Sequence, residues 1–331
     1  LTSCKDNNSG QEGPEFSDTL LSKAPSEVLE IGKEISKDSD NPELYVKRAD
    51  AWARKKYFKQ AVQDIEFALK LDSTVADFHY KLGIYAFEDN QVNKSVTALE
   101  KALSLNPNYM DAKFKLAEIY TVLKQYEKAI GFFEQLIEKE PSNPDNYYWI
   151  ARNYKEKGDT VRALAYFQKT VDLDNDYYDA WIFMGEMYAN NNDPRALPYF
   201  DAALRIKELS IEALYKRALL YQNLKNYPKA VEDYQKITDI NPANPLAYYN
   251  IGYINFQLNQ MERANEYFKK ACEADESYSD AFYMRGLCAE IMGDKISAYE
   301  HYTYVVDKLD PNHELSKEGL NRIKPRKVKI K

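Results

Sequence analysis

The sequence predicts an all-α solenoid in which antiparallel pairs of helices stack one after another, and a repeated pattern of residues predicts it. The pattern has a period of about 34 residues and recurs from residue 42 to residue 312. Periods of about 20 to 50 residues are typical of stacked repeats and not of a globule with one core. The chain has only 11 glycines and no long apolar run, so we expect no membrane-spanning helix.

Two positions of each period carry small side chains, and a third carries a large one. The first small position holds Ala49, Gly83, Ala117, Ala151, Gly185, Ala218, Gly252 and Gly286. The second small position holds Ala61, Ser95, Ala129, Ala163, Ala196, Ala230, Ala264 and Ala298. The large side chains are Ile65, Leu99, Phe133, Phe167, Phe200, Tyr234, Phe268 and Tyr302. Small residues let two helices approach closely while large ones fill the space beside them, so each period predicts one helix pair.

Proline marks the predicted end of the second helix in four periods. These prolines are Pro107, Pro141, Pro242 and, one position late, Pro311. Proline cannot continue a helix and restricts the residue before it. The fifth period is one residue short in the turn at 190–193, where we expect a loop to absorb the deletion.

These spacings resemble those of the tetratricopeptide repeat. The eight units are 42–75, 76–109, 110–143, 144–177, 178–210, 211–244, 245–278 and 279–312. The resemblance implies a right-handed superhelix whose first helices line a concave, protein-binding surface. Asn255 departs from the pattern at position 11, where an aromatic residue or alanine is usual. Arg48, Arg217 and Arg285 depart at position 7, which is commonly aliphatic, and this puts their local packing in doubt.

Helical caps are expected at both ends, because a terminal repeat otherwise exposes its stacking face. At the N-terminal end we expect a capping segment at 25–41, with a helix from about Ser26 to Ser39. Its apolar face would hold Val28, Leu29, Ile31 and Ile35. The C-terminal segment 313–331 would contain a capping helix at Glu314–Ile323 and then a basic tail.

Leu1-Thr2-Ser3-Cys4 resembles a bacterial lipobox, in which a signal peptide is cut before a cysteine that is then acylated. The polar, glycine-containing residues that follow have the composition of a flexible tether, which we place at 1–24. The sequence would then begin inside a signal peptide. This interpretation predicts a lipoprotein in a bacterial cell envelope, in the outer membrane rather than the inner one, facing the periplasm or the surface. The alternative is a free Cys4.

Patterns for catalysis or cofactor binding are lacking, so we predict no enzyme, no cofactor and no metal site. The three histidines show no spacing typical of metal ligands or of a nucleophile's partner. Cys272 and Cys288 lie out of register on sequential helices, which favours two buried thiols over a disulfide. The net charge of −7 argues against nucleic acid as a partner. The basic tail could still contact anionic lipid, nucleic acid or acidic repeats, or stay solvated.

Carboxylates fall in the first turn of most first helices, where the helix dipole favours negative charge. They are Glu43, Asp77, Asp111, Asp145, Asp179, Glu212 and Asp280. We therefore interpret them as capping residues and not as acid–base groups.

Aromatic residues dominate position 5, which the resemblance places on the concave face. The row is Val46, Tyr80, Phe114, Tyr148, Ile182, Tyr215, Tyr249 and Tyr283. Tyrosine offers a large contact area and a hydroxyl, which suits a peptide or a partner's helix. Packing between neighbouring helices is an equal alternative. At position 9, Glu118, Arg152 and Glu186 predict either a binding region or, as the favoured interpretation, a structural ion-pair ladder.

Farther along, apolar residues replace these charges and form the better candidate surface. They are Leu219, Tyr249, Tyr253, Phe256, Tyr283, Leu287 and Ile291. The candidate partner-binding residues are therefore Tyr148, Arg152, Tyr215, Tyr249, Tyr253, Phe256, Tyr283 and Leu287. Val46 and Asp50 do not match the lysine and asparagine with which chaperone adaptors of the family hold a terminal carboxylate.

We therefore predict a non-catalytic scaffold that assembles an envelope complex through its concave face and binds the membrane through lipidated Cys4. The alternative is a surface lipoprotein that binds peptides or glycans in a tyrosine-lined groove. Fold alone does not decide between them.

Overall fold

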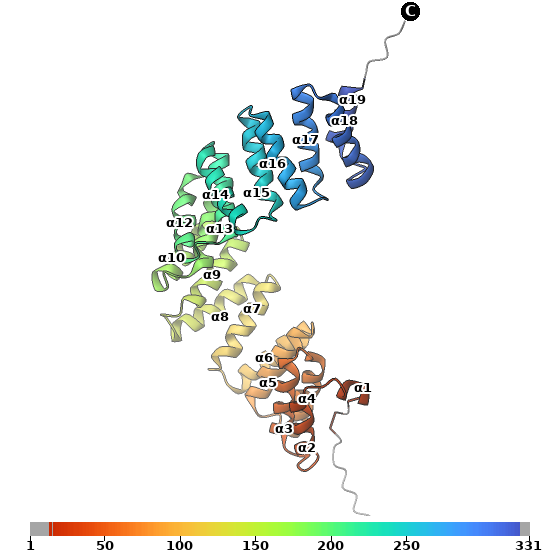
Figure 1. The fold of residues 1–331 in the computed structure, drawn as a ribbon. Coiled ribbons are helices and arrows are strands. Elements are labelled where there is room, and N and C mark those ends of the chain that lie inside the picture. The colour runs from red at the N-terminus through yellow and green to blue at the C-terminus, as the bar shows by residue number, and fades with distance from the viewer. Residues whose placement is uncertain (1–12, 15, 325–331) are drawn as a thin grey trace, which may run out of the picture. The chain divides into compact units, whose positions relative to one another are not determined.

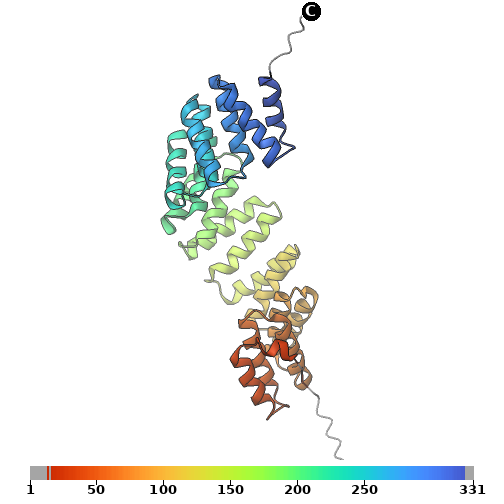
Figure 2. The ribbon, with the colours of Figure 1, turned by 45° about the vertical axis from the view of Figure 1, so that its right-hand side comes forward.

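The computed structural model describes residues 13–14 and 16–324, and all regular structure in that part of the chain is helical. The chain divides after Leu173 into two compact units, called here the N-terminal and C-terminal units. Within each unit, consecutive helices lie side by side in both views (Figures 1 and 2). Among the described residues, no helix combines the length and apolar character needed to cross a membrane.

The N-terminal unit contains four helix pairs behind two short leading helices. The leading helices are α1 (Asp18–Leu21) and α2 (Ser26–Ile35). The pairs are α3 (Pro42–Arg54) with α4 (Phe58–Leu71), α5 (Ala76–Glu88) with α6 (Val92–Leu105), α7 (Met110–Val122) with α8 (Tyr126–Lys139), and α9 (Pro144–Glu156) with α10 (Thr160–Leu173).

The C-terminal unit continues the pattern with four more pairs and a final helix. The pairs are α11 (Tyr178–Ala189) with α12 (Leu197–Ile206), α13 (Ile211–Asn223) with α14 (Tyr227–Ile240), α15 (Pro245–Gln257) with α16 (Met261–Ala274), and α17 (Ser279–Met292) with α18 (Lys295–Tyr304). A 3₁₀ turn, η1 (Pro194–Ala196), precedes α12, and a π-helical turn, η2 (Val305–Leu309), follows α18. The last helix is α19 (Glu314–Ile323).

The small and large positions of the repeat are buried where the two helices of each pair meet. Ala129 and Phe133 of α8 are both fully buried. At Gly185, an added Cβ would lie 2.5 Å from the Phe200 ring, so that helix crossing is too close for any side chain. This burial confirms the predicted repeat register.

A left-handed residue closes the turn between the two helices of every repeat, always at position 15. These residues are Lys56, Asn90, Lys124, Gly158, Asn192, Lys225, Asn259 and Gly293, with φ between 52° and 85°. Such a residue ends a helix tightly. Asn192 keeps this conformation in the shortened fifth repeat, and the tighter η1 turn at the start of the second helix follows it. The expectation that a loop absorbs the deletion is therefore wrong.

Two of the three unusual arginines at position 7 form ion pairs with an aspartate at position 23 of the same repeat. In the first repeat, the Arg48 Nε and Nη2 donate to the two Asp64 carboxylate oxygens at 2.8 and 2.6 Å. In the sixth, Arg217 binds Asp233 in the same bidentate way. Burial raises the pKa of Asp64 to about 6, although Arg48 opposes the rise. The local packing is therefore intact around both arginines.

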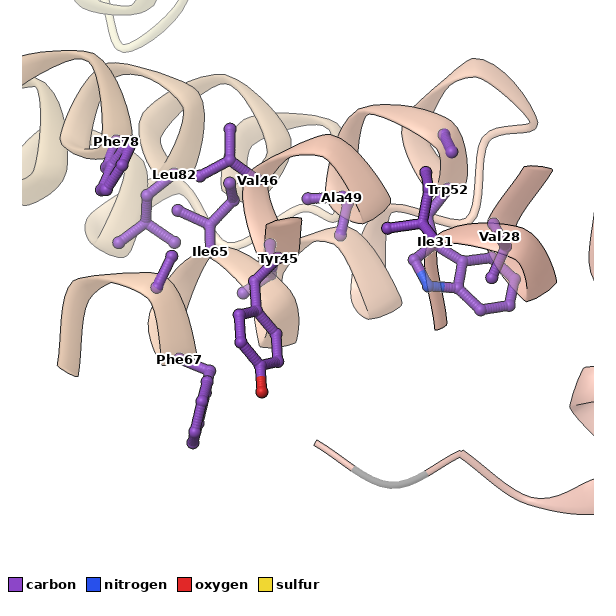
Figure 3. Packing of buried hydrophobic residues seen from close by; sticks show 14 of the residues in the cluster. Val28, Ile31, Tyr45, Val46, Ala49, Trp52, Ile65, Phe67, Phe78 and Leu82 are labelled. Atoms are coloured by element: carbon purple, nitrogen blue, oxygen red, sulfur yellow. The ribbon is translucent and has the colours of Figure 1, made fainter. Parts of the chain in front are cut away.

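Helical segments cover both ends of the repeat array. Val28 and Ile31 of α2 lie beside Trp52 of α3 (Figure 3), whereas Leu29, predicted on the same face, is 42% exposed. Leu29 is therefore not part of the buried face, because it lies about 100° around the helix from Val28. Phe16, Leu20 and Ala24, which lie in the predicted tether, also pack against the first-repeat core, so the tether is shorter than predicted.

The C-terminal cap is formed by α19, which has the predicted bounds. Leu320 and Ile323 of α19 pack against a buried cluster that includes Tyr302 of the last repeat. The basic tail beyond Lys324 lies outside the described residues.

Candidate functional site

Five of the predicted partner-binding residues gather on two neighbouring first helices of the C-terminal unit. Tyr249, Tyr253 and Phe256 lie on α15, and Tyr283 and Leu287 lie on α17. All five are half-buried and pack against one buried cluster. That cluster consists of Ala264, Phe268, Met284 and Cys288. We call the five residues the α15–α17 patch.

The two position-5 tyrosines of the α15–α17 patch pack against other rings. The Tyr249 ring centroid lies 5.4 Å from that of Phe268 and 5.2 Å from that of Tyr278. Burial of its hydroxyl raises the pKa of Tyr249 to about 12. The Tyr283 ring lies 5.7 Å from that of Tyr302. Helix packing therefore explains much of the tyrosine row.

The more open part of this surface is aliphatic and lies at positions 9 and 13. Leu219, at position 9 of α13, is 38% exposed, and Ile291, at position 13 of α17, is 51% exposed. Tyr253 and Leu287 occupy position 9 of α15 and α17, and neither has a hydrogen bond or ring contact among the described residues. Position 9 therefore provides an apolar row along three successive first helices.

The other predicted residues are separate from the α15–α17 patch. Tyr215 of α13 packs near the ring of Tyr234, at 5.8 Å, and belongs to a different apolar cluster. In the N-terminal unit, Tyr148 is only 8% exposed, so it is mainly a core residue. The guanidinium of Arg152 lies 4.6 Å from the centroid of the Trp149 ring, which leaves it half-buried on an aromatic face.

The predicted ion-pair ladder along position 9 is wrong in its partners. Glu118 pairs with Lys115 of its own helix at 3.2 Å, and no ion pair joins Glu118 to Arg152 among the described residues. Glu186 instead pairs with Lys216, at position 6 of the following repeat. Both glutamates pair with a lysine at position 6 of a repeat. These lysines are visible in the sequence and could have predicted the correct partners.

Asp50 shows the same arrangement in the N-terminal unit. Its carboxylate accepts hydrogen bonds from Lys81 Nζ at 2.7 Å and from the Tyr85 hydroxyl. Lys81 occupies position 6 of the second repeat, so a partly exposed ion pair between Asp50 and Lys81 links the first repeat to the second.

The first-turn carboxylates lie where the sequence placed them, and two of them also bind residues at the end of their repeat or just beyond it. Asp77 lies in the first turn of α5 and accepts a hydrogen bond from the Tyr109 hydroxyl at 2.6 Å. Asp280 of α17 lies 3.2 Å from Nε2 of His313. Asp77 therefore ties the first turn of its repeat to that repeat's last residue, and Asp280 ties the last repeat to the C-terminal segment.

Cys272 and Cys288 are both free and buried, which confirms the expectation of two thiols. Burial raises the pKa of Cys272 to about 11 and that of Cys288 to about 12, so both stay protonated. Within residues 13–14 and 16–324, no cluster of three or more His, Cys, Asp or Glu side chains could hold a metal ion. Cys4 lies outside the described residues.

The third unusual arginine, Arg285, faces a histidine instead of an acid at position 23, and this predicts a pH-dependent stability. Burial and the nearby Arg285 charge together lower the pKa of His301 to about 4, against a smaller opposing effect of Asp294. A histidine in the unfolded chain titrates near 6.5. The stability that the folded state gains by keeping His301 neutral is therefore complete above about pH 6.5, and it is lost as the pH falls towards 4. Between pH 7.5 and 5, the parent should lose about 1–2 kcal/mol more than His301→Gln in urea unfolding. Equal losses would contradict a buried neutral imidazole.

Sequence models of the tetratricopeptide repeat match four stretches of the chain: 86–153, 149–210, 211–244 and 246–278. Human "Tetratricopeptide repeat protein 6" is 33% identical over 84 residues, which are 25% of this chain and 16% of that protein. The Saccharomyces cerevisiae "Hsp70/Hsp90 co-chaperone CNS1" is 40% identical over 74 residues, or 22% of this chain and 19% of that protein. The chain spans between 10% and 27% of the length of the curated relatives it matches.

A solved structure with a similar fold is the C-terminal part of a TPR repeat-containing protein from Cytophaga hutchinsonii. It superposes with a TM-score of 0.57 at 19% sequence identity and covers 66% of this chain and 91% of that one. At this identity the likeness concerns the fold alone.

Proposed function

Because the chain belongs to the tetratricopeptide repeat family, we propose that it is a non-catalytic scaffold that binds other proteins through the face of its first helices. In this proposal, lipidated Cys4 tethers the scaffold to a bacterial envelope membrane, where it assembles a protein complex. The observation that carries the binding role is the apolar row at position 9, formed by Leu219, Tyr253 and Leu287.

The α15–α17 patch has the character of a protein-binding surface. Large apolar side chains exposed beside one another mark interaction sites more often than single exposed residues do. Tyr253 and Phe256 are three positions apart on α15, so they face the same side and could receive an amphipathic helix or an extended peptide. Aromatic residues of this kind dominate binding energies at interfaces.

The chemistry of the first repeat does not support capture of a terminal carboxylate. Val46 is buried, and Asp50 already binds Lys81 and Tyr85. An aspartate at this place would repel a carboxylate, so we do not transfer the co-chaperone role of the yeast relative to this chain.

Glycan binding, the alternative function, is less well supported. A sugar would need exposed tyrosine faces to stack on, and Tyr148, Tyr249 and Tyr283 are largely covered by helix packing. Peptide binding in the same groove remains compatible with the scaffold, because both functions use the apolar row.

The partner-binding proposal predicts that Tyr253→Ala combined with Leu287→Ala weakens capture of the native partner. The loss should be at least about 2 kcal/mol, or roughly 30-fold in Kd, because the change removes two adjacent side chains of the three in the apolar row. The partner would first be identified by cross-linking the parent in membranes, and its affinity would then be measured with both purified proteins.

A matched control is the pair Val161→Ala and Ile296→Ala, which removes two strongly exposed apolar side chains outside the α15–α17 patch. This control should bind like the parent. Unchanged affinity of the Tyr253 and Leu287 double variant, with its helix content intact, would contradict the proposal. Loss of helix content would assign the two residues to the core.

The anchor proposal predicts that Cys4→Ala, expressed behind a complete signal peptide, moves the protein from the membrane to the soluble envelope fraction. One acyl chain binds a membrane weakly and several chains hold it firmly, so the parent should stay almost wholly in the membrane fraction. Fractionation without detergent, followed by mass spectrometry of the N-terminal peptide, measures both effects. A Cys4→Ala protein that stays in the membrane, or a parent with an unmodified Cys4, would refute a lipid anchor.

A further inference from the structure

Three repeats share a stack of three side chains at positions 11, 19 and 23, which fall at 11, 18 and 22 in the shortened fifth repeat. A tyrosine at position 11 stacks on an aromatic ring at position 23, and a cation at position 19 lies over the tyrosine. The sets are Tyr120, Lys128 and Phe132; Tyr154, Arg162 and Tyr166; and Tyr188, Arg195 and Tyr199. The ring centroids lie 6.0, 5.6 and 5.4 Å apart, and the cations lie 5.0, 4.4 and 4.8 Å from the tyrosine centroid.

The seventh repeat keeps the outer two members of this stack and lacks the tyrosine. Arg263 occupies position 19 and Tyr267 occupies position 23, but Asn255 stands at position 11. The Tyr267 ring has no aromatic neighbour among the described residues; its ring contact is with Lys270, at 4.9 Å. The seventh repeat therefore has the aromatic ring and the cation, but it lacks the tyrosine that lies between them in the other three repeats.

Arg263 also lacks the acid that neutralises its two arginine counterparts. Arg162 pairs with Asp159, and Arg195 pairs with Asp193, each at 2.6 Å. Gln260 replaces that acid in the seventh repeat, and its contact with Arg263 Nη1 is a long 3.5 Å. In the described part of the chain no carboxylate lies within ion-pair distance of Arg263, so its guanidinium is available to a ligand.

A pocket of about 420 Å³ occupies this part of the structure, within the range of about 300–1,000 Å³ typical of ligand sites. Its lining includes Tyr227 and Val231 of α14, Asn255 of α15, Leu258, and Arg263 and Tyr267 of α16. Asn255 is 8% exposed and donates from Nδ2 to the Ile251 carbonyl at 2.8 Å. Among the described residues nothing donates to its Oδ1, which leaves an open acceptor in the pocket lining.

We propose that this pocket binds an aromatic side chain, of tyrosine or phenylalanine, from a partner polypeptide. The inserted ring would stack on Tyr267, as the position-11 tyrosines stack in three other repeats. Its electron-rich face would receive the Arg263 guanidinium, whose charge is complementary to it. Leu258 and Val231 would cover the rest of the ring. The chain itself thus indicates which chemical group completes the site.

This site goes beyond the proposed binding role of the α15–α17 patch and uses other side chains. The patch lies at positions 5, 9 and 12, whereas the pocket lies at positions 11, 19 and 23 and includes α14 of the preceding repeat. A partner could therefore bind here whether or not the patch is a binding surface.

The test uses N-acetyl-L-tyrosinamide as a probe of the aromatic side chain and N-acetyl-L-leucinamide as its aliphatic control. Binding to the full chain is followed by NMR shifts of the Asn255 side-chain amide and the Arg263 Nε–H. We expect the tyrosine probe to bind at least ten-fold more tightly than the leucine probe. Equal binding of the two probes, or no shift at these groups up to the solubility limit, would overturn the proposal.

Variants then separate the pocket from other sites. Asn255→Tyr supplies the missing ring from within and should abolish probe binding, whereas Asn255→Ala keeps the pocket open and should still bind. Arg263→Gln changes an exposed residue, so it should fold normally and weaken the tyrosine probe several-fold. Probe binding that survives both Asn255→Tyr and Arg263→Gln would refute the site.

A further variant keeps this test independent of the proposed function. Tyr253→Ala with Leu287→Ala should leave probe binding unchanged, because neither residue lines the pocket. Loss of probe binding in that variant would place the probe on the α15–α17 patch and overturn the pocket assignment.

Discussion

The Asp64→Ala variant is expected to unfold with a free energy about 3–5 kcal/mol below that of the parent. The Asp64 side chain is fully buried, and Arg48, its bidentate partner, is almost as deeply buried. Removing the carboxylate leaves a guanidinium with no counter-charge inside the first repeat, where the Phe16 and Tyr45 rings beside it cannot replace the lost hydrogen bonds. Urea unfolding followed by circular dichroism measures the loss.

Two controls show whether the effect comes from the orphaned charge. Replacing both partners, Arg48→Leu with Asp64→Leu, should restore most of the stability, because no buried charge is then left without a partner. Glu232→Ala removes an exposed partner of Lys236 and should cost no more than about 0.5 kcal/mol. A loss below about 1 kcal/mol for Asp64→Ala would mean that water reaches the pair in solution.

A second large loss, about 3–5 kcal/mol, is expected for Phe133→Ala. Phe133 of α8 is fully buried, with its ring parallel to that of Trp149 at 5.9 Å and edge-on to that of Phe114 at 5.5 Å. Phe133 therefore packs against both α7, the first helix of its own repeat, and α9, the first helix of the next repeat. Truncation opens a cavity at both interfaces.

The neighbouring residue provides a matched control. Phe132 is half-buried and stacks on Tyr120 at 6.0 Å, so Phe132→Ala should cost less than about half as much. Repeat arrays can unfold in parts, so each transition in urea should be compared separately. Equal losses for the two variants would show that the assigned register is off by one residue.

The register could be predicted from sequence because close helix packing restricts residue size at fixed positions. Examples are Gly185, where an added Cβ would meet the Phe200 ring of the facing helix, and the fully buried Ala129. Helix ends were also predictable, since α6, α8 and α14 each end two residues before a proline. These constraints act within one repeat and are visible in its own residues.

Features that depend on pairs of positions were harder to predict. Arg48 departs from the family pattern because it binds Asp64, sixteen residues later. The same pairing recurs between Arg217 and Asp233, so a search for coupled departures would have found it. Leu29 was misplaced for a simpler reason, since the helical period tolerates one extra apolar residue beside a buried face.

The candidate site was only partly predictable. Sequence spacing placed Tyr249 and Tyr253 on one face of α15, and the structure has both against the same buried cluster. Spacing could not tell how far each side chain would be covered, because coverage depends on rings from other helices. Tyr278 covers Tyr249 in this way, and it stands at the end of the seventh repeat, outside the positions that mark the groove.

The pairing of each helix with its neighbours in sequence has a consequence for how the chain reaches its native state. Within each unit, strong packing joins helices that follow one another along the chain, such as α3 with α4 and α15 with α16. Such proteins have low contact order, and their search for native contacts is short, in the range of microseconds to milliseconds for small helical domains. A growing chain can therefore complete one hairpin before the next has left the ribosome, and each new hairpin finds a formed surface to dock on.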